Sequence, residues 1–386
     1  MLLPLKQVLN YRMRRQHLAP ETRGACKEDL LRIIRDIQPI HRSLFSLHAR
    51  MDKYDPRWCR ELIDKVRLFK GRFIGGNLYY VAIEDMPLYA TAFRAVLNLR
   101  PFTRKVLGVI EREGPITKDD MGRLLEVGGR RVYRALTELE RAFLIAEVQK
   151  EPLDQFKGSI RYPWNLFRRE YPLVDLDAIG KDEAIQMVLL RFLYSFGPAT
   201  ITEIASWSEF KQSRVRSLVD SLVSEKRVLS SQIENMEETS FFAAGDKRAI
   251  EEAKDSSPFI TILSSSDPIV TASKEDLRRE FGYGRTISSN YLYIMMNGDF
   301  CGAIERHWKE KELWIKNLIL ESTILDDLDL FCQTLQKIES ARASTHKSIK
   351  ICRINWSSVS FFGRAQRWLK EHGYILKGDC FLKKVE

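Results

Sequence analysis

The sequence is poor in the residues that build metal centres and covalent cross-links. Its six cysteines are scattered over 386 residues without a C-x-x-C pair, and its six histidines include no H-E-x-x-H or other ligand pair. Zinc ribbons, iron–sulfur clusters and disulfide frameworks need such residues at short, regular spacings. We therefore expect reduced cysteines, no metal and no cofactor.

Long apolar stretches are lacking too. No run approaches the roughly 20 residues of a membrane-spanning helix. The first ten residues have neither the sustained apolar core nor the cleavage site of a secretory signal. We expect a cytoplasmic protein that is not inserted in a membrane.

What the chain does have is length, ordinary apolar content and positive charge. With 44% hydrophobic residues it can bury the cores of roughly two to four domains. Lys and Arg outnumber Asp and Glu by 62 to 52, for a net charge of +10. A positive excess suits a phosphate-rich partner because neutralised phosphates release counterions, although many basic proteins bind no nucleic acid.

An internal repeat is the most informative feature. Gly114-Pro115-Ile116-Thr117 recurs as Gly197-Pro198-Ala199-Thr200, and the same offset continues without a gap. The coincident positions include Val106 with Leu189, Val109 with Phe192, Arg131 with Arg214 and Leu139 with Leu222. A repeat of this length indicates one structural unit used twice.

Each copy predicts an apolar helix ended by Gly-Pro, a short second helix, a longer third helix and a β-prone tail. The second helices are expected at 119–125 and 202–207, the third at 130–141 and 212–225, and the tails at 143–148 and 227–231. Thr117 and Thr202 are the expected caps of the second helices. This succession is typical of a winged helix.

The third helix of a winged helix can enter the major groove. Its start is basic in both copies, with Arg130, Arg131 and Arg134 in one and Lys211, Arg214 and Arg216 in the other. Because arginine can contact phosphates or base edges bidentately, these six residues are candidate DNA contacts. Winged helices also bind proteins, and the same residues would then be a solvated helix face.

The first hundred residues predict a more distant copy. The apolar spacing indicates helices over 30–37 and 44–51 and an amphipathic helix over 58–69, and the segment 72–81 is a predicted hairpin that turns at Gly75-Gly76-Asn77. Several early basic residues either face phosphates or form a solvated chain end: Arg12, Arg14, Arg15, His17 and Arg23.

From about Ser256 the pattern becomes rich in strands. Strand-like runs are at 259–263, 291–296, 301–305, 313–315 and 349–354, with a last strand near Phe381 and helices at 325–342 and 363–371. Asn297-Gly298 is a strong type I′ hairpin signal. The candidate phosphate contacts in this part are Lys274, Arg278, Arg279 and Arg285, although each taken singly is as typical of a solvated surface.

Five segments, in order along nearly the whole chain, resemble the motifs of one protein family. They are Ile37-Gln38-Pro39 with Leu44-Phe45-Ser46-Leu47-His48-Ala49-Arg50, Gly76-Asn77-Leu78-Tyr79-Tyr80-Val81 with Glu84-Asp85, Phe196-Gly197-Pro198-Ala199-Thr200 with Trp207, Asp267-Pro268-Ile269-Val270, and Gly298-Asp299-Phe300-Cys301-Gly302. In this order the chain resembles the YcaQ/AlkZ family of winged-helix DNA glycosylases, which acts in alkylation and crosslink repair.

The resemblance implies a catalytic Gln-x-Gln or Gln-x-Asp motif. In such a pair an amide orients the attacking water, and the second group takes its proton or offsets the charge of the sugar. Alignment by the distance to Arg50 places Asp36-Ile37-Gln38 on the motif, with its two polar types exchanged. The other register, Gln38-Pro39-Ile40, has no second polar group. We prefer the first, since Pro39 then falls where the family often has proline.

Asp36 and Gln38 are thus the candidate catalytic residues. Because positions i and i+2 lie about 200° apart on a helix, both reach one site only near a helix end or from opposite edges of a cleft. The resemblance places the hairpin near the damaged nucleotide and adds Asn77 and Tyr79 to the DNA-binding candidates, where the family commonly has threonine and histidine.

The predicted fold is α+β, with tandem winged helices followed by a β-rich domain, which the resemblance implies is barrel-like. A divergent winged helix with the catalytic motif is expected over 1–100, winged helices over 101–182 and 183–252, and the C-terminal α+β domain over 253–386. The predicted function is hydrolysis of the N-glycosidic bond of N7-alkylated purines or crosslinked nucleotides in double-stranded DNA, by a monomer associated with the nucleoid. The alternatives are an inactive DNA-binding regulator and a protein-interaction scaffold.

Overall fold

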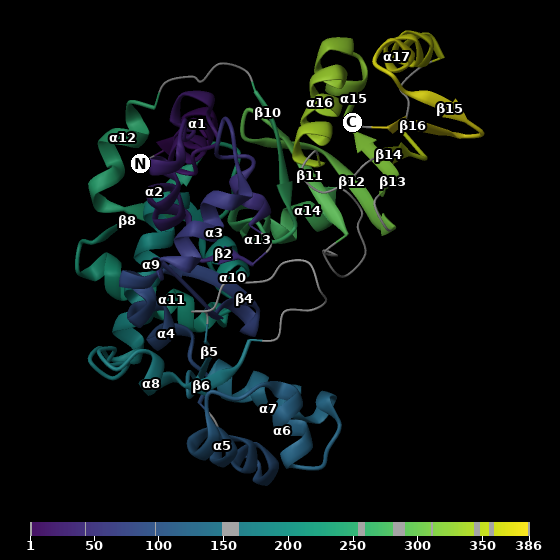
Figure 1. Ribbon diagram of the computed structural model, residues 1–386. Coiled ribbons are helices and arrows are strands. Elements are labelled where there is room, and N and C mark those ends of the chain that lie inside the picture. The colour runs from purple at the N-terminus through teal and green to yellow at the C-terminus, as the bar shows by residue number, and fades with distance from the viewer. Residues whose placement is uncertain are drawn as a thin grey trace.

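The chain folds into a largely helical body with a mixed β-sheet at its C-terminal end (Figure 1). The computed structural model describes residues 2–42, 44–96, 98–148, 162–253, 259–280, 290–309, 312–342, 348–354 and 359–384. In these ranges no helix is both long enough and apolar enough to cross a bilayer.

Both copies of the repeat have the predicted order of elements, three helices and then an antiparallel pair of strands. The first copy comprises α5 (Pro101–Glu113), α6 (Lys118–Leu124), α7 (Gly129–Arg141), β5 (Ile145–Glu147) and β6 (Trp164–Leu166). The second comprises α9 (Lys181–Phe196), β7 (Ala199–Thr200), α10 (Ile201–Ser208), α11 (Gln212–Ser224), β8 (Val228–Ile233) and β9 (Ser240–Ala243). Two short helices follow the copies, α8 (Phe167–Glu170) and α12 (Lys247–Glu251).

The threonines that cap the second helices occupy equivalent positions in the two copies of the repeat. Thr117 caps α6 and accepts a hydrogen bond from the amide of Asp120 at 3.2 Å. In the second copy the cap is Thr200, whose hydroxyl accepts from the Glu203 amide at 3.1 Å while the Glu203 carboxylate accepts from the Thr200 amide at 2.8 Å. The prediction of Thr202 is wrong, because the extended backbone that a cap requires is at Thr200 and Thr202 already lies inside α10.

The first hundred residues contain helices and a small three-stranded sheet of order β2-β4-β3. The elements are β1 (Leu2–Leu3), α1 (Leu5–Arg15), α2 (Lys27–Ile37), β2 (Ile40–His41), α3 (Pro56–Asp64), β3 (Leu68–Arg72), β4 (Leu78–Ala82) and α4 (Met86–Phe93). The predicted hairpin is confirmed as β3–β4, with Gly75 and Gly76 both at positive φ in its turn.

Two predicted helices in this part are wrong or too long. The segment 44–51 contains only the single turn Phe45–Leu47, since Leu44 is left-handed with φ of 56°. The helix expected over 58–69 ends at Asp64, where Val66 adopts φ of 53° and the amide of Arg67 bonds back to the Leu62 carbonyl. The chain then enters β3.

The N-terminal segment packs with the second copy of the repeat. Strand β1 pairs in parallel with β8, and α1 packs against α9 and α12. The shared core contains Leu3 and Val8 from the N-terminus and Phe242 from β9. Arg12 of α1 is buried beside Glu203 and donates to the carbonyls of Phe196 and Pro198. Arg12 is therefore neither a phosphate contact nor part of a solvated chain end.

The C-terminal part is an open sheet, so the predicted barrel is wrong. Its strand order is β10-β11-β12-β13-β14-β16-β15, and within the described residues β10 and β15 are unclosed edges. The strands are β10 (Ile260–Ser264), β11 (Tyr291–Met296), β12 (Asp299–Lys309), β13 (Glu312–Leu320), β14 (Ser348–Ile351), β15 (Ile375–Lys377) and β16 (Cys380–Lys384).

Helices explain why this sheet stays open. β13 and β14 are parallel, and the connection between them includes α15 (Ser322–Leu325) and α16 (Leu328–Arg342). α16 packs against both β10 and α17 (Val359–Glu371), so apolar side chains of the sheet are buried by helices and not by barrel closure. The Asn297-Gly298 hairpin is confirmed, since φ is positive at both residues, as type I′ requires.

A fully buried ion pair ties the C-terminal part to the rest of the chain. Arg50 and Asp267 have 0% side-chain exposure, and their two hydrogen bonds measure 2.7 and 3.0 Å. Arg50 also donates to the Gln16 side chain at 2.9 Å and to the carbonyl of Ser46. Asp267 caps α13 (Pro268–Ala272), which packs on α10 and on α14 (Lys274–Glu280). Arg50 therefore connects three distant segments.

Candidate active site

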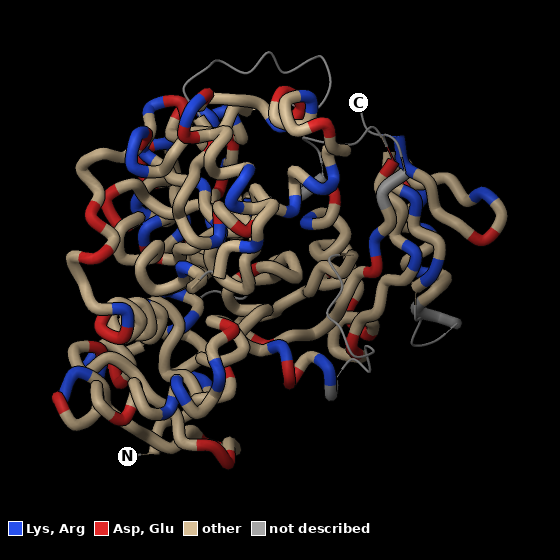
Figure 2. The backbone as a smooth tube through the Cα atoms, turned by 90° about the horizontal axis from the view of Figure 1, so that it is seen from below, with Lys and Arg blue, Asp and Glu red and all other residues tan. Residues whose placement is uncertain are grey.

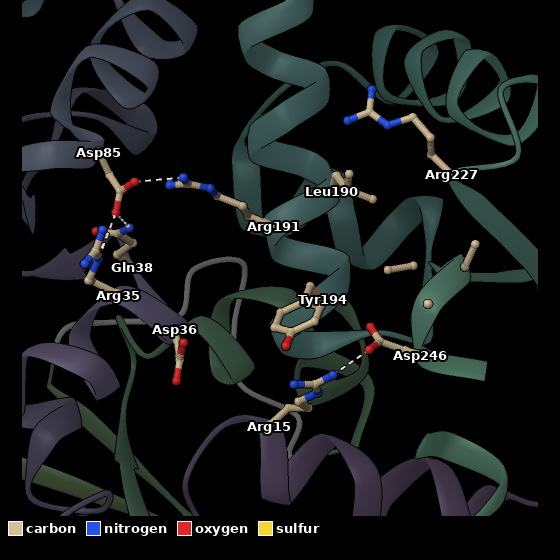
Figure 3. A pocket seen from close by; sticks show the side chains of 13 residues that line it. Arg15, Arg35, Asp36, Gln38, Asp85, Leu190, Arg191, Tyr194, Arg227 and Asp246 are labelled. Carbon is tan, nitrogen blue, oxygen red and sulfur yellow. Dashed lines mark hydrogen bonds and ion pairs between the residues drawn. The ribbon is translucent and has the colours of Figure 1, made fainter. Parts of the chain in front are cut away.

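The end of α2 brings Asp36 and Gln38 to one pocket of about 800 Å³. Asp36 lies in the last turn of the helix, whereas Gln38 follows it with extended backbone, φ −62° and ψ 153°. Because the helix ends between them, two side chains at i and i+2 can line the same space (Figure 3). The volume is in the range of small-molecule sites in proteins.

Gln38 is held rigidly in the wall of this pocket. Its side-chain carbonyl accepts from the amide of Ala82 at 2.8 Å, and its side-chain nitrogen donates to the Asp85 carboxylate at 2.6 Å. The reverse amide orientation would set oxygen against carboxylate, so these two partners determine it. Tyr89 donates to the main-chain carbonyl of Gln38 at 3.1 Å. The residue is 6% exposed.

Asp85 is the centre of a small charged network. It follows β4, in the short turn Ile83–Asp85, and has Arg191 of α9 at 2.7 Å and Arg35 of α2 at 3.5 Å. Figure 3 shows the three side chains converging on one edge of the pocket. Sequence reasoning did not select Asp85 or its two arginines as site residues, although Asp85 belongs to the acidic pair that follows the hairpin motif.

The opposite wall is built around Arg15 of α1. Arg15 pairs with Asp246, and its guanidinium lies 3.9 Å from the centre of the Tyr194 ring. Burial lowers the pKa of Arg15, but Tyr11 and Asp246 outweigh it and the net pKa is raised. Arg15 therefore remains a cation that faces the pocket. Arg227 contributes a further guanidinium to the lining.

Asp36 also lines a second pocket of about 410 Å³. Its carboxylate, 38% exposed, lies 2.8 Å from Nε2 of His17 and 4.0 Å from Arg32. In Figure 3 this carboxylate points away from Asp85. The second pocket is basic, and its arginines are Arg14, Arg15, Arg23 and Arg32. Four of the five early basic residues thus line the same pocket as Asp36: Arg14, Arg15, His17 and Arg23.

The two hairpin residues predicted to contact DNA do not line either pocket. Among the described residues, those that line the two pockets include neither Asn77 nor Tyr79. The turn packs between α7 and the segment after α10, since a Cβ on Gly76 would meet Arg141 and one on Gly75 would meet Glu209. Asn77 is exposed. Tyr79 is 6% exposed with its ring against His41, so it has no surface to offer to DNA.

The six basic residues of the third helices are exposed, in two separate groups. Arg130, Arg131 and Arg134 lie on α7, where Arg131 stacks 4.2 Å from the Phe102 ring. Arg214 pairs with Asp182. Lys211, Arg214 and Arg216 lie at the start of α11. None of the six lines either of the two pockets among the described residues.

Charge is distributed over the whole molecule. Figure 2 shows Lys and Arg interspersed with Asp and Glu along the tube, so basic residues are not confined to one element. In the C-terminal part, Arg278 pairs with Glu275 at 2.6 Å. The side chain of Arg279 and the whole of Arg285, both proposed phosphate contacts, lie outside the described residues. Within the described ranges no three His, Cys, Asp or Glu side chains form a metal-binding group.

A model of the AlkZ-like DNA glycosylase family matches residues 35–306, which include Asp36, Gln38, Asp85 and Arg191. The chain belongs to the AlkZ-like family of DNA glycosylases. This family match begins after α1, so Arg15 and His17 lie outside it. A search of curated proteins finds no match to the chain.

One solved structure supports the fold of this AlkZ-like chain. DNA glycosylase AlkZ from Streptomyces sahachiroi superposes with a TM-score of 0.67 at 14% identity, covering 91% of this chain and 100% of that one. An N-acetylglutamate synthase from Neisseria gonorrhoeae covers 93% of this chain and 98% of its own at 11% identity, but its TM-score of 0.22 carries no argument. The mixed α+β fold is therefore that of AlkZ.

Proposed function

We propose that this AlkZ-like chain removes N7-alkylated or crosslinked purines from double-stranded DNA by hydrolysis of the N-glycosidic bond. The observation that carries the proposal is the pocket that Asp36 and Gln38 share, in a chain of this family. At about 800 Å³ the pocket has room for a nucleotide that is flipped out of the DNA duplex. Arg15 and Arg191 supply cations for its phosphates.

The proposed chemistry needs few protein groups. An N7-alkylated purine is already cationic, so the bond from C1′ to N9 breaks with its electron pair going to the base. Water forms the new bond to C1′, and its proton passes to Asp36, the partly exposed carboxylate. Gln38, held by Ala82 and Asp85, orients the water or the sugar. The products are the free base and an abasic site.

Base release from a duplex that contains 7-methylguanine tests this site. We expect wild type to release the base in single-turnover assays and Asp36→Asn to slow release by about 10² to 10⁴-fold, as loss of a general base does. Gln38→Ala should also slow release, because the water loses its orientation. Asp64→Asn, a change at an exposed carboxylate of α3, is the control.

Two results would count against the proposal. Release at the wild-type rate by both Asp36→Asn and Gln38→Ala would show that the catalytic residues are elsewhere. Absence of release by wild type, with tight duplex binding, would favour the inactive DNA-binding relative. The same assay is then repeated on a duplex with a bulkier N7 adduct or an interstrand crosslink. Base release from that duplex would mean that 7-methylguanine is not the substrate.

We also propose that the two repeat copies are winged helices that bind DNA through α7 and α11, and that the first hundred residues are a more distant winged helix. The support is the order of elements and the exposure of the basic residues on both helices. Removing one phosphate-binding cation should reduce the slope of log K against log salt by about 1.

The test replaces Arg130 and Arg134 with glutamine and measures duplex affinity over a range of salt concentrations. Arg248→Gln, at an arginine of α12 with 85% side-chain exposure, is the matched control. We expect a shallower salt dependence for the double variant and no change for the control. A wild-type affinity that does not depend on salt would overturn DNA binding and favour a protein-interaction scaffold.

A further inference from the structure

His17 lies between two hydrogen-bond acceptors beside the candidate active site. It follows α1, is buried and has φ of 54°. Its Nδ1 lies 3.0 Å from the main-chain carbonyl oxygen of Thr22, and its Nε2 lies 2.8 Å from Oδ2 of Asp36. The ring therefore connects the end of α1 to the last turn of α2.

The two partners determine how the ring is protonated. A carbonyl oxygen can only accept, so Nδ1 carries a proton that it donates to Thr22. A neutral ring would then present a lone pair at Nε2 to the carboxylate of Asp36, and the 2.8 Å contact would join two acceptors. A proton between Nε2 and Oδ2 makes this contact a hydrogen bond, and it is the proton that the pair shares.

This hydrogen bond determines which oxygen of Asp36 is available. Oδ2 is occupied by His17, so Oδ1 is the oxygen left for the pocket. The competing partners are arginines, since Arg32 lies 4.0 Å from Oδ2 and Arg15 lines both pockets that Asp36 lines. A carboxylate that is 38% exposed would turn among these cations without a directional partner.

We propose that His17 is a positioning residue, which holds the Asp36 carboxylate through a shared proton and orients its free oxygen toward the reacting water. The proposal rests on the proposed glycosylase function and deepens it. His17 does not touch the reacting atoms, and it lies outside the segment that the family model matches. Its contribution is orientation of the base, in which small displacements change rates strongly.

Glutamine and asparagine separate the two hydrogen bonds of His17. The amide nitrogen of glutamine takes the place of Nε2 and can donate to Asp36, whereas that of asparagine takes the place of Nδ1 and can donate to Thr22. We expect His17→Gln to keep the single-turnover rate of base release within about threefold of wild type, and His17→Asn to lower it by roughly tenfold or more. Duplex affinity should be unchanged in both, and their melting temperatures control for folding.

The reverse order of the two rates would overturn the proposal. Fast base release by His17→Asn and slow release by His17→Gln would mean that only the hydrogen bond from the ring to the Thr22 carbonyl matters. Equal rates for both variants and wild type would overturn it as well. Asparagine tolerates positive φ better than most residues, so slow release by His17→Asn would not be a backbone effect.

A second measurement does not depend on activity. In ¹⁵N spectra of histidine-labelled protein, we expect a protonated Nδ1 in His17 and an Nε2 resonance that moves when Asp36 is replaced by asparagine. An Nε2 resonance insensitive to Asp36→Asn would overturn the pair, even in an active enzyme. If wild type releases no base, the glycosylase proposal fails, and the spectra still decide whether His17 and Asp36 share a proton.

Discussion

Burial changes the ionisation of single side chains away from the pocket, and Glu140 is an example. Glu140 of α7 is buried against the hairpin strand β3, where it pairs with Arg72. Burial raises the pKa of this carboxyl to about 7; Arg72 opposes the rise and Glu147 adds to it. The folded protein therefore holds a proton on Glu140 at pH values where the unfolded chain, with a pKa of 4.5, has released it.

Glu140→Gln should remove a pH dependence of stability. Between 4.5 and 7 the folded state binds more protons than the unfolded state, so the free energy of unfolding of wild type falls as pH rises through this window. Glutamine does not titrate, so the variant should lose less stability than wild type on going from below the window to above it. Thermal melts on both sides measure this, with Glu225→Gln at an exposed site as the control. Parallel curves for wild type and Glu140→Gln would contradict it.

At the scale of elements, the start of α10 shows how a helix begins. Thr200 and Glu203 form a reciprocal capping box, whereas Thr202 lies inside the helix and contacts Glu238 at its surface. The repeat already indicated this, because Thr200 occupies the position of Thr117 in the first copy. The cap belongs to the residue with extended backbone, not to the threonine nearest the apolar run.

Thr200→Ala should therefore destabilise the protein by about 1 kcal/mol, within the usual range of roughly 0.5–2 for the loss of a cap. Thr202→Ala, the same chemical change two residues later, should have a smaller effect. Urea denaturation of both variants measures the difference. An equal or larger effect at Thr202 would show that the helix begins elsewhere in solution.

At the scale of the whole molecule, one continuous core joins segments that are distant in the sequence. It contains Val81 of the hairpin, Leu193 of α9, and Leu263 and Met295 of the C-terminal sheet. The unit of α5 to α7 has a separate core around Val106 and projects from the body (Figure 1). The buried Arg50–Asp267 ion pair also joins distant segments, because it links α13 to the N-terminal region.

Asp267→Ala should destabilise the protein strongly. It leaves the Arg50 guanidinium buried without its counter-ion, which costs about 3–5 kcal/mol in comparable sites. The C-terminal part should also become more accessible to proteases and to hydrogen exchange, since α13 loses its cap and its anchor. Glu252→Ala, which breaks an exposed ion pair on α12, should leave the melting temperature unchanged. Similar melting temperatures for both variants would contradict the role of this pair.

Local patterns were sufficient for much of the fold. Apolar spacing, Gly-Pro turns and the Asn297-Gly298 dipeptide predicted the helices of the repeat and the hairpins, because these features depend on neighbours within a few residues. For Asp36 and Gln38 the sequence left two arrangements open, a helix end or opposite edges of a cleft, and the structure has the helix end. The order of its motifs was sufficient to recognise the family, which the family model also matches.

Contacts between distant segments decided the rest. Asp85, Arg191, Arg15 and His17 come from four different elements, and no local pattern shows that they surround Asp36 and Gln38. The burial of Tyr79 and the open C-terminal sheet likewise depend on which surfaces pack together. Propensity acts over a few residues, whereas packing and the need to pair buried charges act across the whole chain. The sequence by itself therefore determined most of the elements and the candidate pair, and only the tertiary structure decided the composition of the site around them.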